Sequence, residues 1–140
     1  MIKFRHSGIV VRDIDVSLSF YLNLGFTVIN DQIETGRFID TILGFTKCKV
    51  RTIKMVCKNN QILELLYYIT PVSEDHKKII NSIGCSHLAF TVDNLQLLYD
   101  SLTKSGIEFI NSPAVNDMVK VAFCKDPNDV YLELVEELWI

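Results

Sequence analysis

Apolar residues at helical spacing predict two amphipathic helices. They lie at i, i+4, i+7 and i+8 in the first helix and at i, i+3, i+4 and i+7 in the second, which is the stripe of a helix that buries one face. The first stripe is Ile14, Leu18, Tyr21 and Leu22, and the second is Leu95, Leu98, Tyr99 and Leu102. Asp13 or Asp15 is expected to cap the first helix and Asp93 or Asn94 the second, with Gly25 and Gly106 as their stops.

The other apolar runs predict strands. Four of them are rich in β-branched, aromatic or leucine residues, and turn residues such as Lys58-Asn59-Asn60 and Asp126-Pro127-Asn128-Asp129 separate them. They span Val50 to Cys57, Gln61 to Ile69, Met118 to Cys124 and Val130 to Val135. Further strands are expected before each helix and after each stop glycine.

The chain repeats itself. His6 precedes Gly25 by 19 positions and His87 precedes Gly106 by the same number, so the two halves align at an offset of 81. Leu-Glu-Leu recurs around Glu64 and Glu133 at an offset of only 69, which leaves twelve extra residues in the first half. The segment Thr35 to Thr46 accounts for them and is interpreted as an inserted helix or lid.

The pattern therefore predicts an α+β fold made of two tandem βαβββ modules in one domain, residues 1–140. Module 1 covers residues 1–70 with the insert at 35–46, and module 2 covers residues 85–140. Residues 71–84 form the linker, in which Ser73 and Glu74 are expected to open a helix-like stretch.

Composition narrows the function classes. With 14 Lys and Arg against 17 Asp and Glu, the net charge is -3, which gives no reason to expect nucleic acid or an anionic membrane surface. No run is apolar enough for a secretory signal or a membrane span. The four cysteines form no C-x-x-C pair, which favours free thiols in a cytoplasmic protein, most of them small buried hydrophobes. The expected partners are a small-molecule substrate and a second copy.

Four residues indicate a metal site. Glu64 and Glu133 stand at equivalent places in apolar strands, where a buried carboxylate is costly without a compensating charge. His6 and His87 occupy the first strand of each half, and imidazole is a common metal ligand. Together they would neutralise one divalent ion such as Ni, Zn, Co or Mn, with open positions for water or substrate. One such histidine or glutamate alone is more often a core or surface residue, and His76 is interpreted as surface.

At these residues the chain resembles the vicinal oxygen chelate superfamily, which includes glyoxalase I, methylmalonyl-CoA epimerase, fosfomycin-resistance proteins and extradiol dioxygenases. The stretch FCKDPNDVYLELVE is similar to the closing motif of that family, with Asp129 where glycine is usual. The resemblance implies a glyoxalase-like fold, in which paired modules form a curved mixed sheet around a metal held by His6, Glu64, His87 and Glu133.

Two histidines and two glutamates resemble the ligand set of glyoxalase I most. The resemblance implies a metal-dependent proton-transfer isomerase or lyase, similar to lactoylglutathione lyase, with Glu133 or Glu64 as the catalytic base and Glu133 preferred. Glutathione-using glyoxalases carry an arginine four residues after the first histidine, where this chain has Val10. An acyl-CoA epimerase of the methylmalonyl-CoA type, a metal-free drug-binding module of the bleomycin-resistance type, and a metal-binding sensor are the alternatives.

Secondary candidates surround this set. Arg37, Asp40, Lys47, Lys49 and Arg51 are candidate substrate contacts. Pocket-lining candidates are Phe4, Phe90, Met118 and Tyr131. A homodimer is expected because members of the family cover the apolar edges of their sheets with a second copy.

Overall fold

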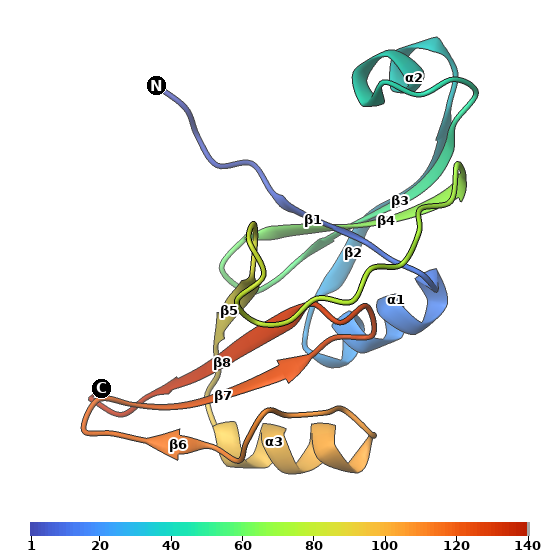
Figure 1. Cartoon of the computed structure of the whole chain (residues 1–140). Coiled ribbons are helices and arrows are strands. Elements are labelled where there is room, and N and C mark those ends of the chain that lie inside the picture. The colour runs from blue at the N-terminus through green and yellow to red at the C-terminus, as the bar shows by residue number, and fades with distance from the viewer. Residues whose placement is uncertain (140) are drawn as a thin grey trace. The chain divides into compact units, whose positions relative to one another are not determined.

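The computed structural model describes residues 1–139, which form two compact units, Met1–Asp75 and the residues from His76 onward. Each unit holds one four-stranded mixed sheet (Figure 1). The first contains β1 (Ser7–Val10), α1 (Ile14–Asn23), β2 (Thr27–Thr35), α2 (Arg37–Leu43), β3 (Lys49–Val56) and β4 (Ile62–Thr70). The second contains β5 (His87–Thr91), α3 (Leu95–Lys104), β6 (Ala114–Val115), β7 (Val119–Lys125) and β8 (Tyr131–Glu137). The α+β class and the repeated βαβββ order are confirmed.

Both sheets share one topology. Their strand orders are β1-β4-β3-β2 and β5-β8-β7-β6, so the first strand of each unit lies beside its last. These two pairs are parallel and the other pairs are antiparallel. The parallel pairing follows from the helix that connects the first strand to the rest of the sheet, because parallel neighbours need a crossover connection.

The second unit departs from the predicted repeat after its helix. A strand was expected directly after Gly106, but only an isolated bridge between Phe109 and Cys124 forms there, and β6 has two residues. Pro113 precedes β6, and proline has no N–H to donate to a ladder. The first unit has no proline at this place, and its β2 runs for nine residues.

The helices begin where the sequence predicts. Asp13 caps α1 by accepting hydrogen bonds from two backbone N–H groups, and Asn94 caps α3 in the same way from Leu97. Both helices are followed by a glycine with positive φ, Gly25 at 103° and Gly106 at 88°.

Helix α1 buries a face slightly different from the predicted one. The buried side chains are Ile14, Ser17, Phe20 and Tyr21, whereas Leu22 is 45% exposed. Tyr21 packs edge-on between Phe20 and Phe26. The predicted stripe was wrong by one position at its C-terminal end because these aromatic contacts set the rotation of the helix.

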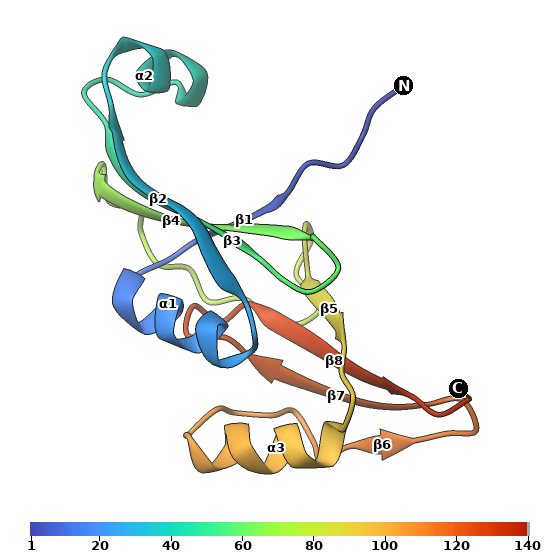
Figure 2. The same ribbon diagram turned by 180° about the vertical axis from the view of Figure 1, so that it is seen from behind.

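Each helix packs on one face of its own sheet and leaves the other face to the glutamates. In the first unit α1 contacts β4, whose buried Leu63 and Leu65 alternate with Glu64. In the second, α3 contacts β7 and β8, whose buried Leu132 and Leu134 alternate with Glu133 (Figure 2). Because successive strand side chains point to opposite faces, both glutamates lie on the face away from the helix.

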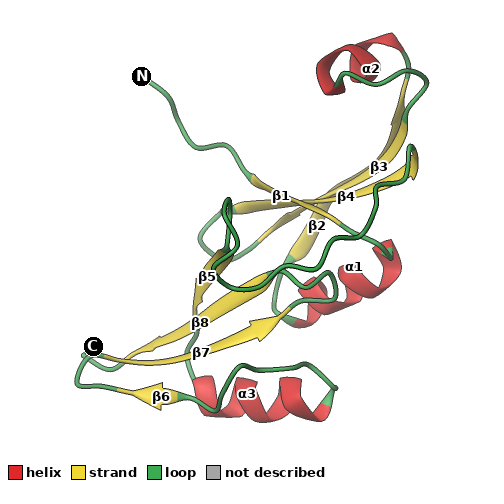
Figure 3. Ribbon diagram, in the orientation of Figure 1, coloured by secondary structure: helices red, strands yellow, loops and turns green. Residues whose placement is uncertain are grey.

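Two connecting segments complete the fold. Helix α2 lies at the far end of β2 and β3, separate from α1 (Figure 3), within the segment interpreted as an insert. The helix-like stretch expected after Ser73 and Glu74 is absent from the described residues of the linker. Ser73 Oγ donates to the carbonyl of Glu74 and is not used to accept from a helix N-terminus. Within residues 1–139, no helix has the length and apolar character needed to cross a membrane.

Candidate metal-binding pairs

Strand register places a histidine and a glutamate together in each unit in the same way. Gly8 of β1 lies opposite Glu64 of β4, and His6 stands two residues before Gly8. Ala89 of β5 lies opposite Glu133 of β8, and His87 stands two residues before Ala89. Residues two apart on a strand share a face. The register therefore predicts that both pairs meet on the helix-free faces.

The first pair is the more buried. His6 Nε2 lies 3.3 Å from Glu64 Oε2, and the two side chains are 32% and 12% exposed. His6 was expected within the first strand, but it lies one residue before β1, which begins at Ser7. The contact lacks hydrogen-bond geometry, so the buried Glu64 Oε2 has no hydrogen-bond donor among the described residues. A buried oxygen of this kind is costly unless a donor or cation satisfies it.

The second pair is held more firmly. His87 Nε2 lies 3.1 Å from Glu133 Oε2, and the side chains are 34% and 27% exposed. The other ring nitrogen, Nδ1, lies 2.6 Å from Ser86 Oγ. The Phe123 ring, directly opposite Glu133 in the register, packs edge-on against the imidazole at 5.3 Å. The imidazole is therefore fixed on three sides.

The donor chemistry of these pairs suits a divalent ion. Each pair offers one imidazole nitrogen and one carboxylate, a mixed set that Zn, Ni, Co and Mn accept. The orphaned Glu64 Oε2 fits the same use, because a cation would supply the missing partner. Within residues 1–139, no three His, Cys, Asp or Glu side chains gather closely enough to hold an ion. The four-residue site thus stays a prediction.

Helix α2 covers part of the glutamate face in the first unit. Its Ile39 joins Cys48 and Val50 in a buried cluster, against which Leu66 and Tyr68 of β4 pack. Leu66 and Tyr68 alternate with buried residues in the same register as Glu64, so they share its face. Through Ile39, the segment 35–46 therefore packs on the same face of β4 that carries Glu64, at the end near Leu66 and Tyr68.

Asp40 has a structural role in this segment. Its carboxylate accepts hydrogen bonds from the backbone N–H groups of Lys47 (3.0 Å) and Cys48 (2.8 Å). The hydrogen bond from the Cys48 side chain, together with these amides, lowers the pKa of Asp40. The same contact and burial raise the pKa of the Cys48 thiol. Asp40 was expected as a substrate contact, but its oxygens are already used to anchor the loop after α2.

Arg51 is also removed from the candidate substrate contacts. It alternates with the glutamate-face residues of β3 and forms a two-point ion pair with Asp31, at 2.9 and 2.7 Å. The pair lowers the pKa of Asp31 and raises that of Arg51. The expectation for Arg51 is wrong because its guanidinium is used on the opposite face. Arg37, Lys47 and Lys49 are exposed, as expected for solvated cations.

The predicted lining residues are dispersed. Phe4 and Met118 are 78% and 55% exposed, and Phe90 lies opposite Leu134 on the helix side of its sheet. Tyr131 is buried and lines a small pocket in the second unit, and Lys125 Nζ lies 5.6 Å from its ring centroid. His76 is exposed, as predicted.

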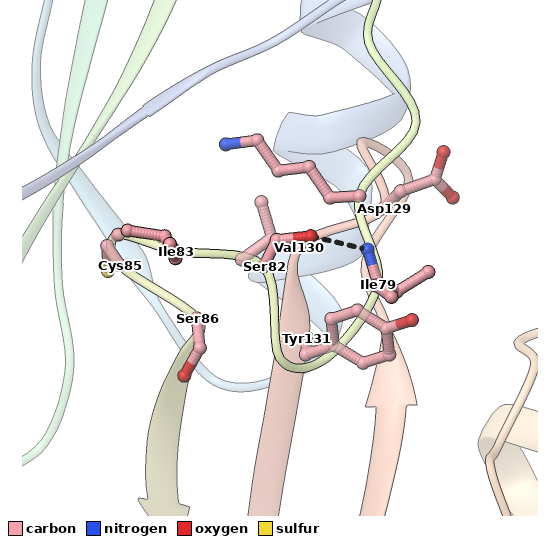
Figure 4. Close-up of a pocket in the computed structure, with 10 residues that line it drawn as sticks. Ile79, Ser82, Ile83, Cys85, Ser86, Asp129, Val130 and Tyr131 are labelled. Atoms are coloured by element: carbon pink, nitrogen blue, oxygen red, sulfur yellow. Dashed lines mark hydrogen bonds between the residues drawn. The ribbon is translucent and has the colours of Figure 1, made fainter.

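The lining of this pocket includes Ser86, the residue that precedes His87 in the sequence (Figure 4). Its lining comes from the segment Lys78 to Ser86 and from Asp129 to Tyr131 at the start of β8. The Ile79 N–H donates to Ser82 Oγ at 3.0 Å, which closes the turn above the pocket. Ser86 belongs both to the lining and to the hydrogen bond with His87. One side chain of the pocket lining, Ser86, therefore contacts the candidate metal ligand His87.

The turn before β8 sets the position of Glu133. Asp126 is 3% exposed, and its Oδ1 accepts from the backbone N–H groups of Asn128 (2.7 Å) and Val130 (2.9 Å). Asp129 takes a positive φ of 62°, the conformation that favours glycine at this position. The turn forms with aspartate there, because aspartate tolerates left-handed backbone better than most residues.

Three residues near the pairs were not predicted. Ser86 and Phe123 contact His87, and Thr52 lies on the Glu64 face with its buried Oγ1 lacking a hydrogen-bond partner among the described residues. Ser86 could have been found, since it is adjacent to His87 in the sequence. Phe123 and Thr52 depend on the pairing of distant strands, which hydrophobic periodicity does not specify.

All four cysteines are free thiols, as predicted. Cys48 and Cys124 are buried, and burial raises the pKa of Cys124 to about 12. Cys57 is half-buried and Cys85 is exposed, so the expectation of small buried hydrophobes holds for two of the four.

Comparison with known proteins identifies relatives of the whole chain. Residues 3–134 match the family model of the Glyoxalase/Bleomycin resistance protein/Dioxygenase superfamily. The lactoylglutathione lyase of Schizosaccharomyces pombe is 29% identical over 96% of this chain, and the chain spans about half (47%) of that enzyme's length. The uncharacterized protein YwkD of Bacillus subtilis is 27% identical, over 96% of this chain and 97% of YwkD.

Solved structures share the fold. A glyoxalase family protein from Bacillus cereus superposes with a TM-score of 0.91 at 21% identity, covering 99% of this chain and 95% of its own. The trypanothione-dependent glyoxalase I of Leishmania major superposes with a TM-score of 0.71 at 23% identity, covering 97% and 87%. The βαβββ repeat is therefore common to this chain and these proteins.

Proposed function

Because the chain belongs to the Glyoxalase/Bleomycin resistance protein/Dioxygenase superfamily, we propose that it is a divalent-metal-dependent proton-transfer isomerase of the glyoxalase I type. Its substrate would be a hemithioacetal, the adduct of a thiol and a 2-oxoaldehyde. The observation that carries the proposal is the repeated pair, in which His6 with Glu64 and His87 with Glu133 meet at equivalent register positions. The likeness to a lactoylglutathione lyase supports the choice of reaction.

One ion taking both pairs would be held by His6, Glu64, His87 and Glu133. Bound there, a divalent ion would act as a Lewis acid toward the oxygens of the substrate. The buried Glu64 Oε2 supports this assignment, since it lies near an imidazole without receiving a hydrogen bond.

A carboxylate of the same set would move the proton. We assign this role to Glu133, whose side chain is 27% exposed against 12% for Glu64, so a substrate C–H reaches it more readily. Glu133 would take the proton from the carbon that bears the hydroxyl and return it to the neighbouring carbon. Glu64, the more buried of the two, would act as ligand.

The thiol of the substrate is expected to be other than glutathione. Val10 stands where glutathione-using relatives carry arginine, and it lies opposite Leu66 on the Glu64 face, 52% exposed. An apolar side chain there offers no charge to a glutathione carboxylate. A panel of hemithioacetals made from methylglyoxal and different low-molecular-weight thiols tests this expectation.

Metal content is the first measurement. The purified protein, dialysed against Zn, Ni, Co or Mn and analysed by elemental analysis, should contain about one ion per chain, because each chain supplies one copy of each pair. His6→Ala and His87→Ala should each abolish tight binding, while His76→Ala, at an exposed histidine, serves as control. Metal retained equally by both variants would show that the ligand assignment is wrong.

Turnover is the second measurement. Exchange of the substrate C–H proton with deuterated solvent, followed by NMR, should fall by about 10²–10⁴ in Glu133→Gln, as expected for loss of a general base. Glu64→Gln should lose less, because an amide oxygen can still bind a metal. Loss of exchange in Glu64→Gln alone would transfer the role of base to Glu64. Unchanged exchange in both variants would eliminate the carboxylate mechanism.

The homodimer expected for this family belongs to the same proposal. Strand β2 is a nine-residue edge strand with exposed Val28, Ile29 and Ile33, a surface that a second copy could cover. Light scattering at micromolar concentration should therefore give twice the chain mass. A monomeric mass would contradict the dimer. It would not affect the assignment of the metal ligands, which elemental analysis tests separately.

A metal-free binding module is the second candidate, and one observation favours it. In the second unit His87 Nε2 lies 3.1 Å from Glu133 Oε2, so a proton on Nε2 would face the carboxylate and stabilise this pair electrostatically without an ion. A protein that remains free of metal after dialysis, yet binds a hydrophobic drug, would support this alternative.

A further inference from the structure

The two histidines differ in what holds the ring nitrogen that faces away from the glutamate. His87 Nδ1 lies 2.6 Å from Ser86 Oγ, and Figure 4 shows the Ser86 hydroxyl directed along the start of β5. His6 has Arg5 at the equivalent position, and among the described residues no hydrogen bond to its Nδ1 is present. The repeat therefore carries a serine contact on one side only.

Two tautomers of His87 fit the observed distances. If Nε2 carries the proton, that proton lies on the side of the ring that faces Glu133 Oε2, which is 3.1 Å from the nitrogen, and the Ser86 hydroxyl donates to Nδ1. If Nδ1 carries the proton, it donates to Ser86 Oγ, and the Nε2 lone pair is free. Without a cation the second arrangement places a lone pair against a carboxylate oxygen 3.1 Å away, which is repulsive. The first tautomer is therefore favoured in the metal-free protein.

Metal binding reverses this preference. A metal ligand must offer a lone pair, so Nε2 has to lose its proton and Nδ1 has to carry one. Nδ1 of His87 then needs a hydrogen-bond acceptor, whereas in the metal-free tautomer it needed a donor. A carbonyl or a carboxylate could serve only the metal-bound form. A hydroxyl serves both, since rotation about its C–O bond exchanges its donor for its lone pairs.

We propose that Ser86 is a positioning residue that lets His87 exchange tautomers when metal binds, because its hydroxyl can donate to Nδ1 in one state and accept from Nδ1–H in the other. The inference rests on the proposed metal site. Phe123 supports it, because its edge-on contact keeps the ring in one plane during the exchange. The second unit would thus supply the preorganised histidine, while His6, whose Nδ1 has no hydrogen bond among the described residues, would adapt to the ion.

The tautomer is read directly by NMR. The protein labelled with ¹⁵N and ¹³C in its three histidines gives ring shifts that distinguish Nε2–H from Nδ1–H, and a His87→Gln variant identifies the His87 signals. At a pH where the ring is neutral, we expect Nε2–H without metal and Nδ1–H with saturating Zn. The Nδ1–H form in the metal-free protein would overturn the exchange, as would an unchanged ring on adding Zn.

Variants of Ser86 test the role of the hydroxyl. Ser86→Ala should weaken Zn binding, measured by calorimetry, by about 10- to 100-fold, the usual loss for an outer-shell partner of a ligand histidine. Ser86→Thr keeps the hydroxyl and should restore most of the affinity. Ser105→Ala, which removes a hydroxyl bonded to the Ser101 carbonyl beyond α3, is the matched control and should leave binding unchanged.

The outcomes separate this inference from the proposed function. Zn binding and turnover that persist at full strength in Ser86→Ala would overturn the role of Ser86 and leave the isomerase intact. Zn binding with tautomer exchange but without turnover on any hemithioacetal would support Ser86 and remove the proposed reaction. A parent protein that binds no Zn would overturn both.

Discussion

Thr52 offers a sharp test of the geometry around Glu64. It lies on β3 opposite Leu66, on the Glu64 face, and only 6% of the residue is exposed. Its Oγ1 has no hydrogen-bond partner among the described residues. Valine has nearly the same shape, with a methyl group in place of the hydroxyl. Thr52→Val therefore removes a buried, unsatisfied polar atom and leaves the volume nearly unchanged.

The sign of the effect follows from this geometry. An unsatisfied buried hydroxyl costs roughly 1–3 kcal/mol, whereas a satisfied one stabilises by about 1 kcal/mol. We therefore expect Thr52→Val to raise the free energy of unfolding by about 1–2 kcal/mol. With a urea dependence of about 1–3 kcal/mol/M, the midpoint should rise by roughly 0.5–1 M. If the hydroxyl were satisfied, the midpoint would fall by a similar amount.

Urea titration of the metal-free protein, followed by circular dichroism, measures this shift. Thr27→Val is the matched control. Thr27 is exposed on β2, so this substitution should change the free energy of unfolding by no more than about 0.5 kcal/mol. A lower midpoint for Thr52→Val, with the control unchanged, would refute the reasoning, because it would mean that Oγ1 has a partner in solution.

Three further predictions concern the turn, the loop after α2 and the thiols. Asp126→Ala should lower the free energy of unfolding by about 3 kcal/mol in urea, because backbone N–H groups in the turn lose a charged acceptor. The pKa of Asp40 is lowered, so its stabilisation is present above about pH 4 and is lost as the pH falls through the lowered value. Asp40→Asn should accordingly flatten the urea midpoint between pH 2 and 5, and an unchanged slope would contradict the assignment. Ellman's reagent at pH 8 should modify exposed Cys85 rapidly and Cys124 only on unfolding, since burial raises the pKa of Cys124 to about 12; fast reaction persisting in Cys85→Ser at Cys124 would show that its burial is wrong.

The sequence determined the elements and their repetition. The helix caps at Asp13 and Asn94 and the stops at Gly25 and Gly106 depend on local backbone chemistry, which neighbouring residues specify. The equal spacing from histidine to glycine in the two halves fixed the βαβββ order, because repeated elements fold alike.

The sequence also identified residues that the structure brings together in pairs. The four residues were predicted as one set, and the structure shows His6 3.3 Å from Glu64 and His87 3.1 Å from Glu133. The sequence pointed to the glutamates because an acidic residue inside an apolar strand is costly without a partner. The gathering of all four into one site stays a prediction.

Tertiary structure alone decided the remaining features. Strand register placed Thr52 and Phe123 beside the glutamates and turned Arg51 to the opposite face, and a register shift of one residue would have reversed all three. The loop after α2 uses Asp40, which the sequence offered to a substrate, because its carboxylate lies within reach of two unpaired backbone amides. These contacts bring together residues that are far apart in the sequence. Neither the spacing of hydrophobic residues nor local secondary-structure propensity specifies such contacts.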